Sequence, residues 1–199
     1  GPTPVFTLFS PPENPMTASF ETITLGGGCF WCLEAVYQQV KGVEKVISGY
    51  AGGHVPNPDY ETVCAETTGH AEVVQLHFDP RIVSYRQILE IFFVIHDPTT
   101  LNYQGNDVGA RYRSVIFTLD DTQMHIAKEL ISELSNGKHF SRPIVTEIQA
   151  APIFYPAEDY HQNYFIKNGG KPYCAFVIQP KLDNFILEFN EMIKSELSN

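Results

Sequence analysis

The fold of this chain is organised around one stretch of sequence, which reads Gly26-Gly27-Gly28-Cys29-Phe30-Trp31-Cys32. Just before it, apolar and polar residues alternate over 20–25, which predicts a β-strand. Over 29–40, apolar side chains recur at helical spacing, which predicts an amphipathic helix. The three glycines are therefore expected to form the turn that takes the chain from the strand into the helix.

The first cysteine of this stretch is a candidate nucleophile. Cys29 lies where the helix is predicted to begin, so unpaired backbone N–H groups and the positive end of the helix dipole converge on it. Both favour the thiolate over the thiol. Cys32 lies one helical turn further on, and its sulfur could pair with that of Cys29 or act after it. The alternative is that Cys32 is a small buried residue.

The two aromatic residues between these cysteines have two interpretations. Phe30 and Trp31 either pack in the core or provide apolar surface beside the nucleophile. The pattern leaves both interpretations open for Phe30. For Trp31, the only tryptophan of the chain, its position beside a presumed exposed sulfur favours the pocket.

Composition narrows the classes of function. The chain has 199 residues, enough for one domain with a complete core. It carries 13 basic and 23 acidic residues, a formal net charge of −10. Because the basic residues are not clustered, we expect no interface with nucleic acid or with an anionic membrane. No apolar run is long enough to span a bilayer.

The four cysteines are too few and too unevenly spaced for the disulfide framework of a secreted protein. A zinc site built from them would lack a second Cys-x-x-Cys, and the scattered histidines form no His-Glu-x-x-His. The glycine run has neither the ending of a phosphate loop nor the spacing of a dinucleotide fingerprint. We therefore expect no metal, no cofactor, and a reducing compartment, the cytoplasm.

The N-terminus is expected to stand apart from the domain. Prolines recur through residues 1–15 and disfavour regular structure, and Gly1-Pro2 is typical of a cleaved expression tag. Residues 1–15 are thus a tag remnant or an N-terminal arm, and Met16 is a candidate native start. Residues 16–199 are predicted to form a single catalytic domain.

The other elements follow from the same two periodicities. Further strands are predicted at 43–51, 70–78, 113–118 and 145–150, and helices at 85–96, 121–136, 158–168 and 182–197. Gly137 is expected to cap the helix that precedes it. The first six elements run β-α-β-β-α-β, the ferredoxin-like order. We therefore predict an α/β (α+β) fold, with a mixed sheet, a ferredoxin-like core, flanking helices and an extended C-terminal segment.

One carboxyl group breaks the apolar pattern of the strand at 70–78. Alternation puts Glu72 on the same face as Val74 and Leu76. A carboxyl group on an apolar face is costly unless it is paired or protonated, and burial raises its pKa. Such a group can give up a proton near neutral pH. The alternative is that Glu72 lies in water at the end of the strand.

A long polar loop over 97–109 is expected to be functional, because loops of this length without regular structure usually are functional or disordered. Its glycines and amides favour a defined shape. Nearby, Tyr60 and Tyr112 each have a phenolic O–H that could bind a polar ligand group. Taken singly, each tyrosine is more often structural.

Taken in order, the motifs of this chain resemble those of the A-type peptide methionine sulfoxide reductases. The resemblance begins at Gly28-Cys29-Phe30-Trp31 and extends over most of 21–181. The further matching blocks are Gly49-Tyr50-Ala51-Gly52-Gly53, Asn57-Pro58 with Tyr60, Val63-Cys64, Thr68-Gly69-His70-Ala71-Glu72, His96-Asp97-Pro98-Thr99, Gln104-Gly105-Asn106-Asp107-Val108-Gly109, Tyr112-Arg113-Ser114, Ala157-Glu158-Asp159-Tyr160-His161-Gln162 and Tyr173-Cys174.

The resemblance implies a substrate and roles for the residues already singled out. The substrate would be a methionine S-sulfoxide, free or within a protein. Its methyl group would lie against Phe30 and Trp31. Its oxygen would be held by Glu72, Tyr60 and Tyr112, with Asp107 in the supporting network. Cys29 would attack the sulfur and Glu72 would act as the acid.

The resemblance also implies a recycling step. Attack would leave Cys29 as a sulfenic acid, which a second thiol converts to a disulfide that thioredoxin reduces. Cys174 matches the family's C-terminal recycling position. Cys32 stands where many members have Gly or Ser, and it is a competitor for this role, although a disulfide at a helix start needs tolerant geometry. Cys64 is expected to lie on a strand, buried and inert.

Two other functions remain open at this stage. Cys29-Phe30-Trp31-Cys32 could serve a thiol–disulfide oxidoreductase, or Phe30 and Trp31 could belong to a non-catalytic module that binds oxidised methionine. Our hypothesis is a cytoplasmic, monomeric, cofactor-free repair enzyme. Its partners would be methionine sulfoxide and thioredoxin.

Overall fold

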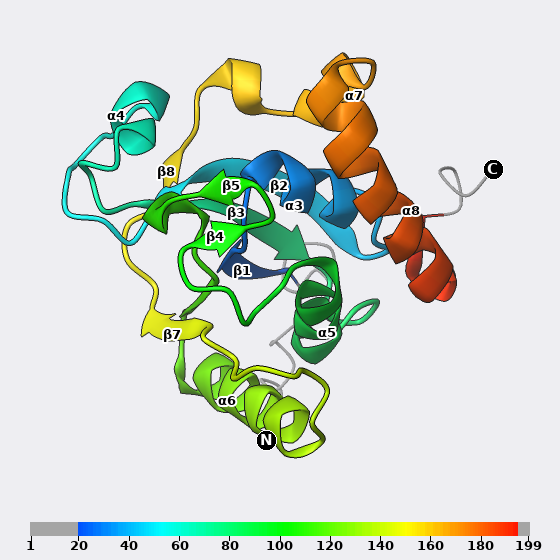
Figure 1. The fold of residues 1–199 in the computed structure, drawn as a ribbon. Helices are drawn as coiled ribbons and strands as arrows, with labels where there is room; N and C mark the ends of the chain where they lie inside the picture. Colours follow the sequence, from blue (N-terminus) through cyan, green and yellow to red (C-terminus); the bar gives the residue numbers. More distant parts are fainter. Residues whose placement is uncertain (1–19, 195–199) are drawn as a thin grey trace, which may run out of the picture.

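The computed structural model describes residues 20–194. The predicted arm at 1–15, the candidate start Met16 and the end of the last predicted helix lie outside the described residues. The strands of the main sheet are β1 (Glu21–Gly26), β2 (Val43–Ala51), β3 (Ala71–Phe78), β6 (Val115–Thr118), β7 (Glu147–Ala150) and β8 (Tyr155–Pro156). Their order across the sheet is β7-β6-β1-β3-β2-β8 (Figure 1).

The central four strands confirm the ferredoxin-like prediction. Strands β6, β1, β3 and β2 are neighbours and pair antiparallel, whereas β7 pairs parallel with β6, so the sheet is mixed. The principal helices are α3 (Phe30–Tyr37), α5 (Tyr85–Ile95), α6 (Asp121–Asn136) and α8 (Gln179–Glu188). Helix α3 connects β1 to β2 and α5 connects β3 to β6, as β-α-β-β-α-β requires.

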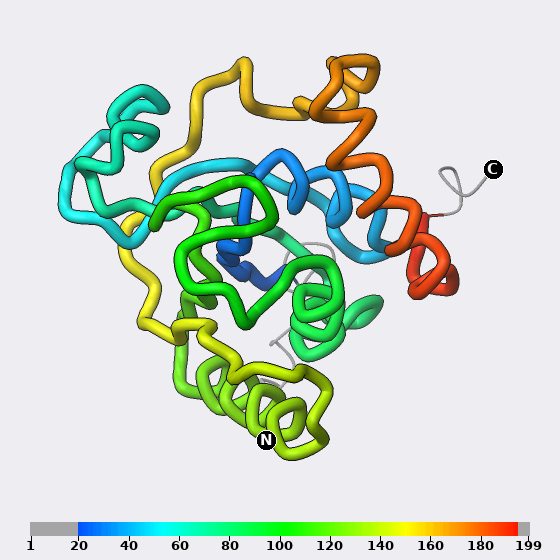
Figure 2. Tube along the Cα trace, viewed as in Figure 1, coloured from blue at the N-terminus to red at the C-terminus, as the bar shows by residue number. Residues whose placement is uncertain are grey.

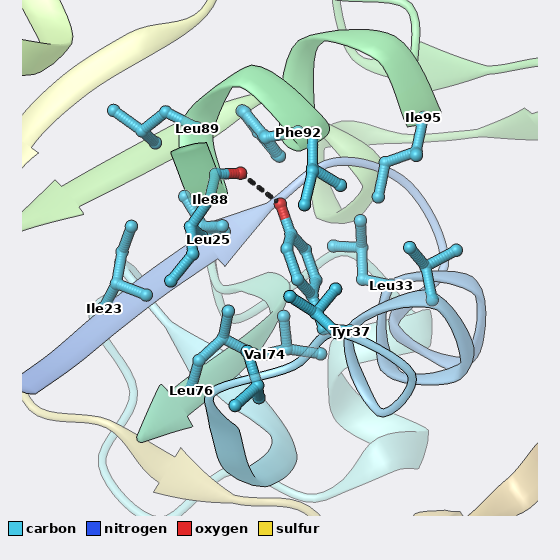
Figure 3. Close-up of a cluster of buried hydrophobic side chains, with 14 of the residues drawn as sticks. Ile23, Leu25, Leu33, Tyr37, Val74, Leu76, Ile88, Leu89, Phe92 and Ile95 are labelled. Carbon is cyan, nitrogen blue, oxygen red and sulfur yellow. Dashed lines mark hydrogen bonds between the residues drawn. The ribbon is translucent and has the colours of Figure 1, made fainter. Parts of the chain in front are cut away.

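The main core lies between the sheet and these helices. Alternate residues of β1 and β3 meet the apolar faces of α3 and α5 (Figure 3). Tyr37 is fully buried, and its O–H donates to the backbone carbonyl of Ile88 at 2.8 Å, so the phenol is satisfied inside the apolar core. The core also includes residues of α6 and α8, so it joins elements from most of the described chain.

The opposite face of the sheet holds a smaller apolar cluster. Val73, Val115 and Phe117 point to this side, and Phe154 from the segment before β8 packs against them. Because side chains alternate along a strand, this arrangement fixes the other residues of β3, Glu72 among them, on the helix-covered face.

The predicted polar loop has an ordered shape of its own. It contains a small hairpin, β4 (Tyr103–Gln104) and β5 (Asp107–Val108), whose turn includes Gly105 with a positive φ of 56°. The Gln104 side chain donates to the Asp97 carbonyl at 2.6 Å and accepts from the Asp97 N–H at 3.0 Å. These two bonds tie the hairpin to the end of α5.

The predicted helix at 158–168 is wrong in extent. The structure has a short 3-10 helix, Asp159–His161, followed by α7 (Tyr164–Asn168). Asn163 interrupts them with a left-handed φ of 57°. The buried Glu34 carboxyl group of α3 accepts from the N–H groups of Asn163 and Tyr164, at 2.8 and 3.1 Å. This contact anchors the start of α7 on α3.

The last predicted helix, 182–197, is also misplaced. Helix α8 begins three residues earlier, at Gln179, and ends at Glu188. A 3-10 turn follows, Asn190–Met192, after which Ile193 forms an isolated bridge with Val40. Beyond the helix, the backbone bonds the segment after α3. The Met192 carbonyl accepts from the Lys41 N–H at 2.7 Å, and the Lys194 N–H donates to the Gln39 carbonyl at 2.8 Å.

The segment that carries Cys174 is a widened helical turn that the sequence did not predict. Cys174–Ile178 has π-helical bonding, in which the Gln179 N–H donates to the Cys174 carbonyl. Pro180 has no N–H to donate to the carbonyl four residues earlier, and its ring crowds that carbonyl. The wider turn accommodates this missing bond where the chain enters α8.

One smaller expectation, for Cys64, needs correction, and another, for Gly137, is confirmed. Cys64 is neither on a strand nor buried, because it ends a short helix, α4 (Tyr60–Cys64), and is partly exposed. That helix begins at a capping box in which Asp59 and Thr62 bond each other's backbone N–H groups. Gly137 is the C-cap residue of α6, as predicted, and its N–H donates to the Glu133 carbonyl at 2.9 Å; the left-handed conformation is taken by Lys138.

Candidate active site

The glycine turn places Cys29 directly at the start of α3. Cys29 is the N-cap residue, with extended backbone, and its carbonyl accepts from the Cys32 N–H at 3.1 Å. Gly28 has φ of +96°, and a Cβ atom at Gly27 would lie 2.9 Å from the Phe92 ring. The turn therefore needs glycine for its backbone conformation at one position and for space at the next.

The resting state of Cys29 differs from the sequence prediction. Its side chain is only 8% exposed. Burial, the Cys32 thiol and the charge of Glu72 together raise the pKa of Cys29, and they outweigh the Trp31 N–H, which lowers it. The helix N-terminus alone would favour the thiolate, but the sequence does not reveal how deeply the sulfur is buried. Cys29 is thus a thiol in this structure.

Glu72 lies on the apolar face of β3, as alternation predicted, and not in water. It is 1% exposed, and its Oε1 accepts from the Phe30 N–H at 3.1 Å, at the first turn of α3. Burial raises the pKa of Glu72 to about 8, although the Phe30 N–H and the charge of Arg111 oppose the rise. The Arg111 Nε lies 4.0 Å from Glu72 Oε2. A carboxyl group with this pKa holds its proton at neutral pH.

Replacing Glu72 by Gln is therefore expected to stabilise the folded protein at neutral pH. An unfolded Glu has a pKa of about 4.3, so between that value and about 8 folding must add a proton to Glu72. Wild-type stability then falls as pH rises through this window. Gln needs no proton and can still accept from Phe30. At about 1.4 kcal/mol per pH unit, the gain at pH 7 is on the order of 3 kcal/mol.

Urea unfolding at pH 5 and pH 8 measures this effect, with Glu188→Gln, a change at an exposed position on α8, as the matched control. The control should keep the wild-type pH dependence, whereas Glu72→Gln should lose most of it. An equal slope in Glu72→Gln and wild type would show that Glu72 is ionised in the folded protein.

The structure brings both candidate tyrosines close to Glu72. Tyr60 begins α4, where its N–H donates to the Glu158 carboxylate at 2.8 Å. Tyr112 is 8% exposed and packs in the same cluster as Cys29. Burial raises the pKa of both phenols. The Cys64 side chain and then the charge of Glu72 add to the rise at Tyr60, and the charge of Glu72 adds to it at Tyr112, so each remains an O–H donor.

Asp107 belongs to the same region but contacts a residue that the sequence reasoning did not single out. Its carboxylate accepts from the Tyr173 O–H at 2.7 Å. The Tyr173 oxygen also lies 3.8 Å from Cys32 Sγ. Tyr173 thus links the loop hairpin to the beginning of α3.

The two aromatic residues after Cys29 have different surroundings. Phe30 is fully buried in the main core, so the core interpretation holds for it in this structure. Trp31 is partly exposed and stacks on Tyr164, with ring centroids 3.7 Å apart and planes 6° apart. Its Nε1–H donates to His161 Nδ1 at 3.1 Å. Sequence reasoning assigned no role to His161 or Tyr164, although His161 lies in a motif block that could have pointed to it.

The structure gathers three cysteines in one cluster and leaves Cys64 outside it. Cys29, Cys32 and Cys174 pack together with Tyr112, and Cys174 is fully buried. Contact with the Cys29 thiol, together with Lys181 and Tyr173, lowers the pKa of Cys32, although burial opposes it. Burial raises the pKa of Cys174. All four cysteines are free thiols.

A cleft of about 510 Å³ leads to the first two of these sulfurs. Its walls are the β4–β5 hairpin on one side and the segment from Tyr173 to Lys181 on the other. Figure 2 shows these two segments, in green and orange, on either side of the beginning of α3. A ligand in this cleft would lie directly over Cys29.

The described residues contain neither a group of side chains suited to a metal ion nor a membrane-spanning helix. Within 20–194 no three His, Cys, Asp or Glu side chains are grouped so that they could hold a metal ion. No helix in the same part of the chain is long and apolar enough to cross a membrane.

Comparison with known proteins identifies the family. The family model described as peptide methionine sulfoxide reductase matches residues 21–193. The chain is 60% identical to the peptide methionine sulfoxide reductase MsrA of Polynucleobacter asymbioticus, over 88% of this chain and 92% of that protein. The range matched by the family model includes every residue discussed in this subsection.

Solved structures agree. Mxr1 from Saccharomyces cerevisiae in reduced form superposes with a TM-score of 0.74 at 35% identity, covering 79% of this chain and 91% of that one. Mxr1 in complex with Trx2 superposes with a TM-score of 0.53 at 27% identity, covering 74% and 86%. The family model and the curated relative are both described as methionine sulfoxide reductases, which favours this function over a thiol–disulfide oxidoreductase or a non-catalytic module. With a buried thiol and a buried neutral acid meeting at the start of α3, it belongs to the peptide methionine sulfoxide reductase family, the enzymes that reduce methionine sulfoxide.

Proposed function

We propose that the chain reduces methionine S-sulfoxide, free or within a peptide, through a sulfenic acid on Cys29. The observation that carries the proposal is the position of Glu72. Its protonated carboxyl group accepts from the N–H of Phe30, the residue that follows Cys29 at the start of α3. A sulfoxide sulfur is a poor electrophile until its oxygen is hydrogen-bonded or protonated. A sulfur nucleophile and a neutral acid must therefore face each other across it.

The proposed first step needs only the substrate, the Cys29 thiol and the Glu72 carboxyl group, and no added oxidant or reductant. Glu72 gives its proton to the sulfoxide oxygen while Cys29 attacks the sulfur. An S–S bond forms between Cys29 and the substrate as the S=O oxygen becomes a hydroxyl group. That hydroxyl group then passes from the substrate sulfur to Cys29 as the S–S bond breaks, so Cys29 becomes S–OH and methionine leaves as the thioether. The thiol proton of Cys29 restores the Glu72 carboxyl group, so Cys29 need not be a thiolate before the substrate binds.

Tyr60 and Tyr112 support the same step. Both remain O–H donors next to Glu72, so they can hold the sulfoxide oxygen as charge develops on it. We place the methyl group of the substrate at the Phe30 and Trp31 side of Cys29. Because Phe30 is fully buried here, its contribution would be the floor of that subsite.

Recycling uses a second thiol and an external dithiol. We propose that Cys174 attacks the Cys29 sulfenic acid, forming a disulfide and releasing water, and that thioredoxin then reduces the disulfide. The solved complex of Mxr1 with Trx2 supports a thioredoxin partner. Cys32 remains the competitor, since it packs against Cys29 as closely as the helix allows. Free thiols throughout favour a reducing compartment, the cytoplasm.

We propose a single catalytic domain over 16–199. Within the described residues 20–194, one core contains residues from β1 near one end and α8 near the other. We also propose that the enzyme is a monomer.

The deciding experiment needs no recycling partner. Reduced enzyme is incubated with the S- or the R-epimer of a methionine sulfoxide peptide, without external reductant, and disulfides are mapped by mass spectrometry. We expect methionine from the S-epimer only, with a Cys29–Cys174 bond. A Cys29–Cys32 bond would change the recycling thiol and keep the chemistry. Methionine from the R-epimer, or no disulfide at Cys29, would overturn the proposal.

A further inference from the structure

The cleft over Cys29 does not end at the reactive sulfur. A second cleft, of about 480 Å³, shares two of its wall residues, Gln104 and Lys181, and is lined further along by Arg142 and Phe140. Clefts of about 300 to 1,000 Å³ each hold a drug-sized ligand. Side by side they form a groove larger than a single methionine sulfoxide would fill.

The shared wall is rigid on one side. Gln104 is 9% exposed, and its side chain is fixed by Asp97 and by Thr100 Oγ1, to which its Nε2 donates at 3.0 Å. Opposite it, Phe176 and Val177 are 79% and 40% exposed at the edge of the Cys29 cleft. Two adjacent exposed apolar side chains beside a reactive site are typical of a binding surface.

The charges along the groove leave one cation without a partner. Asp107 is bonded to the Tyr173 O–H, and Asp97 lies 3.4 Å from Arg142. No carboxylate of the described chain lies within ion-pair distance of Lys181. Its charge is nevertheless felt at Cys32, where it favours the thiolate. In a chain with net charge −10, Lys181 is therefore a local site for a carboxylate.

We propose that this groove binds the peptide around the oxidised methionine, and that Lys181 selects segments with a carboxylate side chain near that methionine. The inference rests on the proposed function and refines its substrate to peptide-bound methionine sulfoxide with an acidic neighbour. Phe176 supplies apolar contact to the flanking residues. Lys181 and Phe176 lie on the wall of the Cys29 cleft, so the flanking residues of a peptide would contact them more extensively than a small substrate does.

The test compares peptides with a small substrate. Capped peptides carry one methionine S-sulfoxide and place Glu, Gln or Lys in turn at each of the two positions on either side. N-acetyl-methionine S-sulfoxide methylamide is the small substrate, and dithiothreitol is the reductant, so thioredoxin docking plays no part. The readout is kcat/KM, with kcat and KM separated.

Wild type should prefer Glu over Lys peptides by about fivefold at one position or more, the size of a partly exposed ion pair, mainly through KM. Lys181→Met should remove the preference and Lys181→Glu should reverse it. Lys128→Glu, an equal charge change on the exposed face of α6, should leave it intact. The preference should also shrink between 50 and 500 mM salt.

A second pair of variants tests the apolar contact that Phe176 provides. Phe176→Ala should raise KM severalfold for peptides and by a smaller factor for the small substrate, which has no flanking residues to place against this wall of the cleft. Leu187→Ala, at a residue 83% exposed further along α8 that lines neither cleft, should change neither. An unchanged preference in Lys181→Glu, or none in wild type, would overturn the inference while the small substrate is still reduced. If the small substrate is not reduced by wild type, the proposed function fails first.

Discussion

Cys29→Ser is expected to lower kcat/KM for a methionine sulfoxide peptide by at least about 10⁴-fold, because the hydroxyl group is a far weaker nucleophile than the sulfur it replaces. The variant should also form no methionine in a single turnover, with dithiothreitol or with thioredoxin. The measurement is methionine released per enzyme in rapid-quench samples, analysed by chromatography.

Two thiol variants serve as controls for this result. Cys64→Ser removes a sulfur outside the cluster but keeps a hydroxyl group that can bond the Tyr60 side chain in its place, so its activity should stay within about twofold of wild type. Cys174→Ser should still release one methionine per enzyme but fail to turn over with thioredoxin. Substantial turnover by Cys29→Ser with any thiol reductant would remove Cys29 as the nucleophile.

Glu72→Gln is expected to slow the chemical step by about 10² to 10⁴-fold, the usual contribution of a positioned acid. Substrate binding should change much less, because the amide is nearly the same shape and can still accept from Phe30. The effect should therefore appear in the single-turnover rate at saturating sulfoxide and not in its half-saturation concentration. An unchanged rate would remove Glu72 as the acid.

The pH profile identifies the acid more specifically. The wild-type single-turnover rate should fall above pH 8 from loss of the Glu72 proton, since burial sets its pKa at about 8. Glu72→Gln has no such proton, so this limb should vanish from its profile. Glu72→Asp, which keeps an acid but moves it back by one methylene, should be slow yet retain a pH-dependent limb. The same Gln substitution thus slows the reaction and stabilises the fold.

The parts of the fold that the sequence predicted well are those whose packing follows directly from a period. Strand β2 and helix α6 have the predicted bounds, Val43–Ala51 and Asp121–Asn136. The position of Glu72 on the covered face follows from alternation along β3. In each case the local pattern and the final packing agree, so a single sequence is enough.

The parts that failed depend on contacts between distant segments. No local sequence signal shows that the Glu34 carboxyl group will bind the Asn163 N–H. This contact lies between the 3-10 helix Asp159–His161 and α7, where one continuous helix was predicted. His161 and Tyr164 reach Trp31 only because of that contact. The prediction that Cys29 is a thiolate failed for the same reason. The start of the helix can be predicted from the sequence, but the residues that bury the sulfur and raise its pKa cannot.

The widened turn at Cys174–Ile178 has a consequence for how the recycling thiol becomes accessible. Cys174 is fully buried, yet a reductant must reach its sulfur. Since Pro180 already deprives this turn of a regular helical bond, local opening there loses less than opening of α8 or of the sheet would. The fold therefore has a helical turn with one backbone hydrogen bond missing next to the sulfur that has to be exposed, and the sheet and the other helices can stay closed while that turn opens.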